Sequence, residues 1–227
     1  MKEVEVYRVL MDERWELEDL YIFPHTYSQI HAFIYCLDFE LEERKEKRID
    51  HSLMNYPWQG GYSYTNLYKV LNALIPVEDN PKIAEIKYAS PGWIDLLMNP
   101  DVALQIAKSL GILIGAGVAA MEAFKRIDKS RLDMARNRRK NQVEMFKFSV
   151  AEAKYLNQMS EEIAKNLGFE NLDKLNARTK SPEVTLKLLL AHQRRMNKMV
   201  EYVASGKAKL PLSTEKKLTS DCGVPSI

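Results

Sequence analysis

The chain changes character close to Pro100, and this change limits its possible folds more than any other feature. Residues 1–100 carry 10 basic and 17 acidic side chains, whereas residues 101–227 carry 23 basic and 14 acidic ones. The first hundred residues also hold 15 of the 21 aromatic side chains. Such an asymmetry is typical of two structural modules, one of which meets an anionic partner. We therefore expect one module over residues 1–100, a second over 101–212 and a flexible tail over 213–227.

Composition indicates a folded chain with a sizeable core. Of its 227 residues 46% are hydrophobic and 28% are charged, with only nine glycines, which argues against disorder. The start of the chain alternates polar and apolar residues and lacks the apolar centre of a signal peptide. Cys36 and Cys222 are its only cysteines, so a disulfide-stapled secreted domain is not expected. These features together favour a cytoplasmic protein.

The first hundred residues show strand and helix periods in turn. Residues 3–11 alternate as a half-buried strand does, and residues 26–47 and 62–75 repeat apolar side chains at helical spacing. Pro24 is expected to interrupt helical structure, and Pro76 to end it. The sequence Ser90-Pro91-Gly92-Trp93 predicts a type II turn with a positive φ at the glycine, inside a hairpin of strands 83–88 and 93–98. We expect an α+β module with a small three-stranded sheet and two helices on one face.

The second half reads as α-helical and coiled-coil-like. Apolar stretches cover residues 102–124 and 143–167, and the second of these ends at Gly168, a typical C-terminal cap. Ser181 and Pro182 then predict the start of a last helix, which runs to Gly206. Helices of this length with apolar stripes favour antiparallel pairing and association with another copy or another protein.

The apolar stretch 102–124 contains three closely spaced glycines that allow three interpretations. Gly115, Gly117 and the residues around them imitate a dinucleotide-binding fingerprint, but the charged segment after residue 131 does not suit the second buried strand that this site needs. A membrane helix is the second interpretation, although the uncharged run 109–121 is short for a span. The third is a helix buried in protein, in which Gly111, Gly115 and Gly117 face a close neighbour. We expect the third.

A run of basic residues follows and is the strongest candidate for binding. On one helix these side chains would spread around most of the circumference, suited to phosphates of nucleic acid or of an anionic membrane. The alternative is a solvated helix whose cations pair with acids of the first module. The candidate anion- or partner-binding residues are Lys125, Arg126, Lys129, Arg131, Arg136, Arg138, Arg139 and Lys140.

No arrangement of residues predicts catalysis. The four histidines, His25, His31, His51 and His192, have no metal-ligand spacing with one another or with the cysteines. There is no G-x-S-x-G serine and no phosphate-loop lysine. We therefore predict no catalytic residue, no metal and no cofactor. An aromatic cluster of Trp58, Tyr62, Tyr64 and Tyr68 either stacks on a partner or fills the core.

Three segments resemble a scattered group of uncharacterised bacterial proteins. They are residues 27–33 (YSQIHAF), 60–63 (GGYS) and 86–94 (IKYASPGWI). The resemblance implies an α+β module that ends in a Y-x-S-P-G turn and is followed by helices or a membrane-like segment. It also implies a prokaryotic or phage-related intracellular source, and it carries over no catalytic residues.

Taken together, the sequence favours a non-enzymatic interaction or adaptor protein that self-associates through its helical half. The alternative is an effector or accessory protein that binds nucleic acid or, peripherally, an anionic membrane through residues 125–140. In either case the expected partner is a macromolecule or a second copy of the chain.

Overall fold

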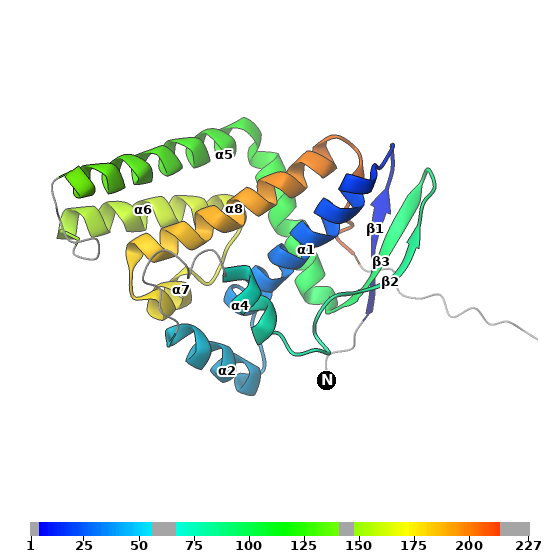
Figure 1. Cartoon of the computed structure of the whole chain (residues 1–227), viewed down its shortest axis with the longest axis horizontal. Coiled ribbons are helices and arrows are strands. Elements are labelled where there is room, and N and C mark those ends of the chain that lie inside the picture. Colours follow the sequence, from blue (N-terminus) through cyan, green and yellow to red (C-terminus); the bar gives the residue numbers. More distant parts are fainter. Residues whose placement is uncertain (1–4, 56–66, 141–147, 214–227) are drawn as a thin grey trace, which may run out of the picture.

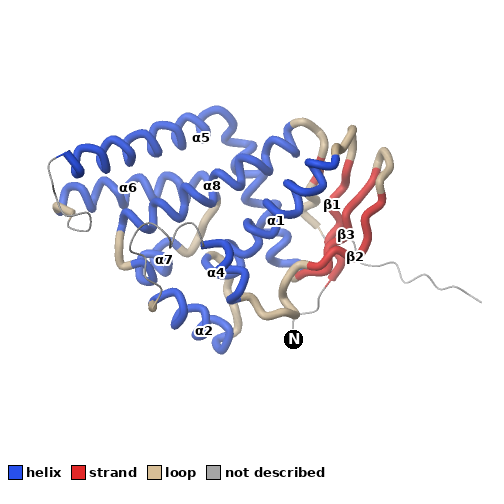
Figure 2. Tube along the Cα trace, in the orientation of Figure 1, coloured by secondary structure: helices blue, strands red, loops and turns tan. Residues whose placement is uncertain are grey.

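A computed structural model describes residues 5–55, 67–140 and 148–213, and it shows an α+β fold (Figures 1 and 2). The predicted tail and three members of the aromatic cluster, Trp58, Tyr62 and Tyr64, lie outside these residues. The helices are α1 (Leu17–Leu37), α2 (Glu43–Met54), α4 (Leu67–Leu74), α5 (Pro100–Lys140), α6 (Val150–Leu167), α7 (Leu172–Thr179) and α8 (Pro182–Ala204). The strands are β1 (Glu5–Met11), β2 (Lys82–Lys87), β3 (Gly92–Met98) and β4 (Ala208–Lys209).

The sheet is antiparallel with the order β2-β3-β1-β4. The three strands predicted from alternation are present, and β1 pairs with β3 from Glu5 opposite Met98 to Met11 opposite Gly92. The fourth strand was missed because two residues are too few to show a period. Gly206, with φ of +79°, lies at the turn after α8, and Ala208 and Lys209 then pair with Met11 and Leu10.

The ends of the described chain are joined by more than this pair of strands. Trp15 Nε1 donates to the carbonyl of Lys207 at 3.0 Å, and the hydroxyl of Tyr7 donates to the carbonyl of Pro211 at 2.8 Å. Lys207 also forms an ion pair of 2.7 Å with Asp19. The segment after α8 therefore belongs structurally to the N-terminal sheet.

The hairpin before α5 forms as predicted, but its turn is of another kind. The Ser90–Pro91 peptide bond is cis, and Gly92 is not among the residues with positive φ. A Cβ atom at residue 92 would lie 2.4 Å from the carbonyl oxygen of Lys87, so glycine is needed there for close approach of the backbone. The predicted type II turn is wrong.

Helix α1 lies at the centre of the molecule, between the sheet and the other helices (Figure 1). It continues through Pro24, which was expected to interrupt it, because the buried stripe of α1 outweighs the loss of one backbone hydrogen bond. The predicted helix over residues 26–47 is instead divided at Asp38, and α2 starts afresh at Glu43.

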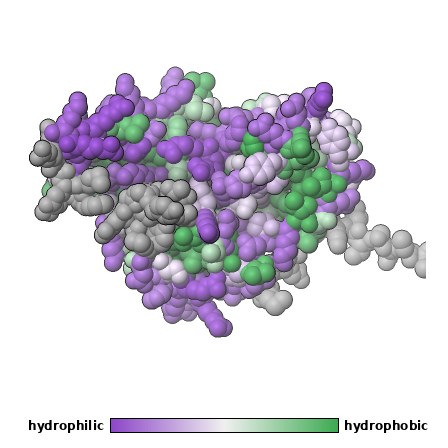
Figure 3. All heavy atoms as spheres, viewed as in Figure 1, coloured by the Kyte–Doolittle hydropathy of each residue, from purple (hydrophilic) through white to green (hydrophobic). Residues whose placement is uncertain are grey.

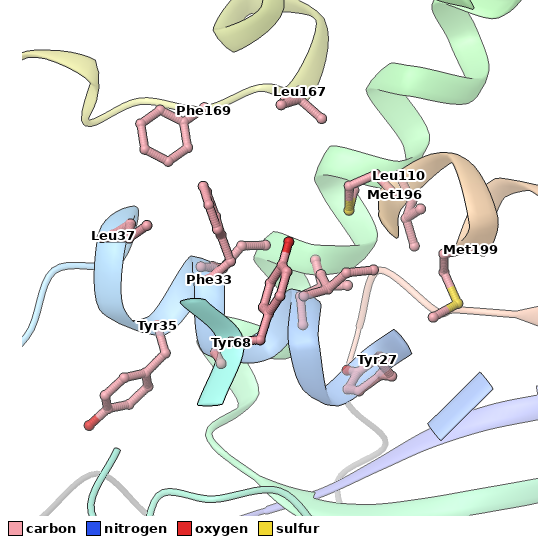
Figure 4. Close-up of a cluster of buried hydrophobic side chains, with 14 of the residues drawn as sticks. Tyr27, Phe33, Tyr35, Leu37, Tyr68, Leu110, Leu167, Phe169, Met196 and Met199 are labelled. Carbon is pink, nitrogen blue, oxygen red and sulfur yellow. The ribbon is translucent and has the colours of Figure 1, made fainter. Parts of the chain in front are cut away.

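One hydrophobic core extends across the predicted module boundary. It includes Phe33 and Leu37 of α1, Leu110 of α5 and Met196 of α8, all no more than 2% exposed. Figure 4 shows these side chains gathered together with Phe169, which follows α6. The change at Pro100 therefore marks a change in secondary structure, whereas the separate packing expected of two modules is replaced by shared packing of α1 against α5 and α8.

One helix boundary in the second half differs from the sequence prediction, and one predicted capping bond does not form. Residues 143–147 of the predicted helix lie outside the described residues, and α6 begins at Val150, because Ser149 and Glu152 form a reciprocal capping box at its start. Its end at Gly168, with φ of +63°, is confirmed. Pro182 opens α8 as predicted, but the Ser181 side chain makes no capping hydrogen bond.

Candidate functional site

The candidate binding surface is built on the distal part of α5, residues 118–140. Gly117 divides the helix, since its φ of +52° and ψ of −127° are not helical, and the two parts point in different directions (Figure 1). The part before the break packs into the core. The distal part lies beside α6 and α8, and the rest of its circumference faces solvent.

Two of the eight predicted basic residues serve the fold. The side chain of Arg138 is only 8% exposed, pairs with Glu152 at 3.2 Å, and places its guanidinium 4.2 Å from the centre of the Phe148 ring. Arg131 is 15% exposed and pairs with Asp128 at 3.1 Å. Arg138 ties α5 to α6, Arg131 pairs within α5 itself, and the charges of both are compensated.

The other six lie on the outer side of the helix. Arg126 pairs with Glu162 of α6, and Arg136 with Asp133 at 3.5 Å. Lys125, Lys129, Arg139 and Lys140 are exposed and have no ion-pair partner among the residues that the structure describes. The acids that pair with this helix come from α5 and α6, not from the N-terminal region as one alternative required.

The outward residues form one stripe rather than a full circumference. The exposed positions 118, 122, 125, 129, 132, 136 and 140 follow one another at steps of three and four, which places them on one face of a helix. Glu122 is the one acid of this stripe. The stripe therefore carries an excess of positive charge, interspersed with the exposed side chains of Val118 and Leu132.

A small pocket of about 110 Å³ lies at the far end of the same helix. Arg131, Arg138, Arg139 and Lys187 line it together with Glu183 and apolar side chains. Lys187 pairs with Glu183 at 2.6 Å, and the acids paired with Arg131 and Arg138 compensate two further cations. The pocket therefore has little uncompensated charge of its own.

The prediction that three glycines make close helix contacts is wrong. A Cβ atom at Gly111, Gly115 or Gly117 would meet nothing within 4 Å, and all three residues are exposed. The close approach lies elsewhere, at Gly168, where a Cβ atom would come within 2.6 Å of Ile112 Cδ1. Residues 112–114, which imitated a strand before a dinucleotide fingerprint, are helical, so the structure does not form that site.

Helix α5 is long and apolar enough to cross a membrane, and 39% of its most apolar window is buried inside the protein. Val102, Ile106 and Leu110 on its inner side are at most 2% exposed, as expected for a helix packed in a core. The opposite side exposes Ile112 at 37%, Ile114 at 38% and Val118 at 73%. The proximal helix is therefore buried on one side only.

An open hollow of about 790 Å³ lies where α1 ends, and Asp38 lines it. Its carboxylate accepts hydrogen bonds from the backbone N–H groups of Glu170 and Asn171, at 2.8 and 2.9 Å, and from Gln105 Nε2 at 2.9 Å. Burial outweighs these donors and raises the pKa of Asp38 to about 6. Its role in joining α1, α5 and α7 had no signal in the sequence, because its partners lie 67 and more residues away.

Cys36 and two of the four histidines, His31 and His192, are held in the core. Burial raises the pKa of the Cys36 thiol to about 12, and Sγ of Cys36 contacts the carbonyl of Leu71. Burial lowers the pKa of His31 to about 4 and that of His192 to about 3, and the His192 ring stacks on Phe33 at 4.0 Å. Tyr68, the described member of the aromatic cluster, is also buried. Within residues 5–55, 67–140 and 148–213, no group of three or more His, Cys, Asp or Glu side chains is arranged to hold a metal ion.

Comparison with protein-family models, with curated proteins and with solved structures finds no match to this chain.

Proposed function

We propose that this protein is a non-enzymatic interaction module and that the outward stripe of distal α5 binds an anionic partner. The observation that carries the proposal is the sorting of the cations along this helix. Lys125, Lys129, Arg139 and Lys140 remain uncompensated by described acids on a surface that the fold leaves open.

In a helix with a purely structural role, the charged side chains would turn inward and pair with acids. The same helix shows how, because Arg131 and Arg138 turn inward, lie close to acids and pack on apolar side chains. The outer lysines do neither. A row of lysines on one helix face attracts polyanions and loses that attraction as salt screens it.

The non-enzymatic part of the proposal is supported by the state of the reactive groups. A thiol with a pKa of about 12 is not a nucleophile at neutral pH, and histidines with pKa values of about 4 and 3 do not exchange protons there. All three groups pack in the core around α1.

A second surface favours a protein partner or a second copy of the chain. Leu17 and Tyr21 of α1 are 85% and 71% exposed, and Ile83 and Ile86 of the edge strand β2 are 50% and 45% exposed. An apolar hollow of about 130 Å³ lies between α1 and this strand, and Figure 3 shows hydrophobic surface over the same region. The apolar stripes that predicted self-association through the helical half are largely buried within the chain itself, so this surface is the better place for it.

The proposal is tested by reversing charge on the stripe. The double substitution Lys125→Glu/Lys129→Glu should lower the salt concentration at which the full-length protein elutes from immobilised heparin. The control Lys69→Glu/Lys82→Glu makes the same change in net charge at two exposed lysines of α4 and β2. Because two anion contacts are lost, the slope of log affinity against log salt should fall by about 2 for the stripe variant alone. Equal elution of the two variants would contradict the proposal.

A further inference from the structure

The break in α5 exposes a group of apolar side chains directly before the basic stripe. Val118 is 73% exposed, and Ile112, Ile114 and Met121 are 36–38% exposed. Gly111, Gly115 and Ala119 between them are exposed as well. In the space-filling view, hydrophobic surface appears at the bend of α5, next to the hydrophilic surface of its distal part (Figure 3). We call these seven residues, together with Glu122, Lys125 and Lys129 of the outward stripe, the bend surface.

Val118, the most exposed apolar residue of the bend surface, faces the same way as its two lysines. Val118, Lys125 and Lys129 occupy one helix face at steps of seven and four residues, and Leu132, Arg136 and Lys140 continue that face. The stripe from Val118 to Lys140 is about 33 Å long at 1.5 Å per residue. A partner that lies along this helix therefore meets apolar side chains at one end and mainly cations over the rest, with Glu122 and Leu132 among them.

The identity of the partner follows from what each class of polyanion offers. A nucleic acid would satisfy the lysines through its phosphates but would leave Val118 and Ile114 against a charged backbone. An anionic bilayer offers phosphate headgroups to the lysines and, a few ångströms deeper, an acyl boundary to the apolar residues. Only the bilayer uses both halves of the bend surface.

We propose that the bend surface binds peripherally to an anionic lipid bilayer, with Val118 and Ile114 entering the acyl boundary and Lys125 and Lys129 meeting the headgroups. This inference rests on the proposed binding of an anionic partner and names its chemistry. The helix lies on the membrane rather than across it, because Val102, Ile106 and Leu110 on its other side are buried in the core.

The test uses the full-length protein and vesicles of phosphatidylcholine alone or of phosphatidylcholine and phosphatidylglycerol in equal parts. The protein should sediment with the anionic vesicles and remain in solution with the neutral ones. Ile114→Ser/Val118→Ser should weaken this binding about tenfold or more, since it removes the apolar contacts, and should leave heparin elution unchanged. The control Met54→Ser/Val77→Ser alters two apolar residues of similar exposure, 47% and 76%, outside both proposed surfaces, and should bind vesicles as the parent does. Thermal unfolding of each variant checks that the fold is intact.

The outcomes separate this inference from the proposed function. If the unsubstituted protein does not bind anionic vesicles, or if Ile114→Ser/Val118→Ser binds them as strongly as the unsubstituted protein does, the lipid assignment is wrong. Heparin or duplex DNA binding that still depends on Lys125 and Lys129 would then keep the anionic partner and identify it as a soluble polyanion. Loss of that dependence as well would overturn both proposals.

Discussion

The two parts of α5 belong to one helix by sequence, yet they are stabilised in different ways. The proximal part, before Gly117, buries Ile106 and Leu110 at 0% and 2% exposure in the central core. The distal part is held through the smaller side chains of Ala120 and Ala123, through Ile127 and through the ion pair of Arg138 with Glu152 of α6. Because the distal part buries little of its surface against the rest of the protein, its outer face is available for binding.

The comparison also shows why the break lies where it does. Gly117 adopts a φ of +52° that other residues rarely reach, which turns the distal helix away from the direction of the proximal one. The turn lets the distal part follow α6 and α8 instead of continuing past the core (Figure 1). A straight helix of the same sequence would lose one of the two sets of contacts.

The largest expected effect comes from shortening a side chain on either side of the break. Leu110→Ala should lower the free energy of unfolding by about 2–5 kcal/mol, because it leaves a cavity in the core. Leu132→Ala, at a residue that is 41% exposed on the distal part, should change it by less than about 0.5 kcal/mol. Urea unfolding followed by circular dichroism measures both. Similar values for the two variants would show that the two parts are equally built into the fold.

As pH falls, the core region should lose stability at a higher pH than the distal helix does. His31 and His192 have folded-state pKa values of about 4 and 3, below the ordinary 6.5, so protons bind the unfolded chain preferentially as pH falls below 6.5. Asp38, raised to about 6, acts in the opposite direction and offsets part of this loss. The two histidines together lose about 3 kcal/mol between pH 6.5 and 5, and after the offset by Asp38 the net loss is about 2 kcal/mol.

Unfolding by urea at these two pH values measures the loss. The substitution His192→Phe should reduce it, because the ring that stacks on Phe33 then no longer titrates. Stability that is constant from pH 6.5 to 5, or that rises toward pH 5, would mean that the histidines are not neutral and buried.

Whether the fold requires the break at Gly117 can be tested by adding one methyl group to this residue. Gly117→Ala should destabilise the protein by about 1–3 kcal/mol, since alanine is strained at this φ and ψ. Thermal unfolding should show a lower midpoint. If Gly117→Ala is as stable as the parent, a straighter helix is accessible and the bend is not required by the fold.

The smallest expected effect is a gain at Gly111, six residues earlier. A Cβ atom there meets nothing within 4 Å, and the residue lies in regular helix. Gly111→Ala should therefore stabilise the protein, by up to about 1 kcal/mol. A loss of stability instead would support the close contact that the sequence predicted for this glycine.

The sequence predicted those parts of the fold that depend on local periods. Alternation identified β1, β2 and β3, and the cap residues Gly168 and Pro182 marked helix ends correctly. The glycines near residue 115 were misinterpreted because spacing alone does not distinguish a glycine that allows close packing from one that allows a backbone break. Only a φ value separates Gly117 from Gly111.

The candidate site was predictable as a segment but not as a surface. Counting charges located residues 125–140, whereas the division into inward Arg131 and Arg138 and outward Lys125 and Lys129 depends on which side of the helix packs on α6 and α8. The exposed apolar residues at the bend had no signal of their own, since a buried helix and a half-buried one have the same composition. The position of Gly117, where the helix changes direction, decides between them.

The pairing of β1 with β4 also has a consequence for synthesis on the ribosome. The outer edge of β1 is covered by Ala208 and Lys209, and Trp15 is hydrogen-bonded to Lys207. A nascent chain that has not yet exposed these residues therefore has a first strand with an open edge, although β1 can already pair with β3. Open edges invite pairing with other chains. Completion of the sheet is thus delayed until Ala208 and Lys209 have been translated, and the outer edge of β1 is covered only after β2, β3 and all the described helices have been made.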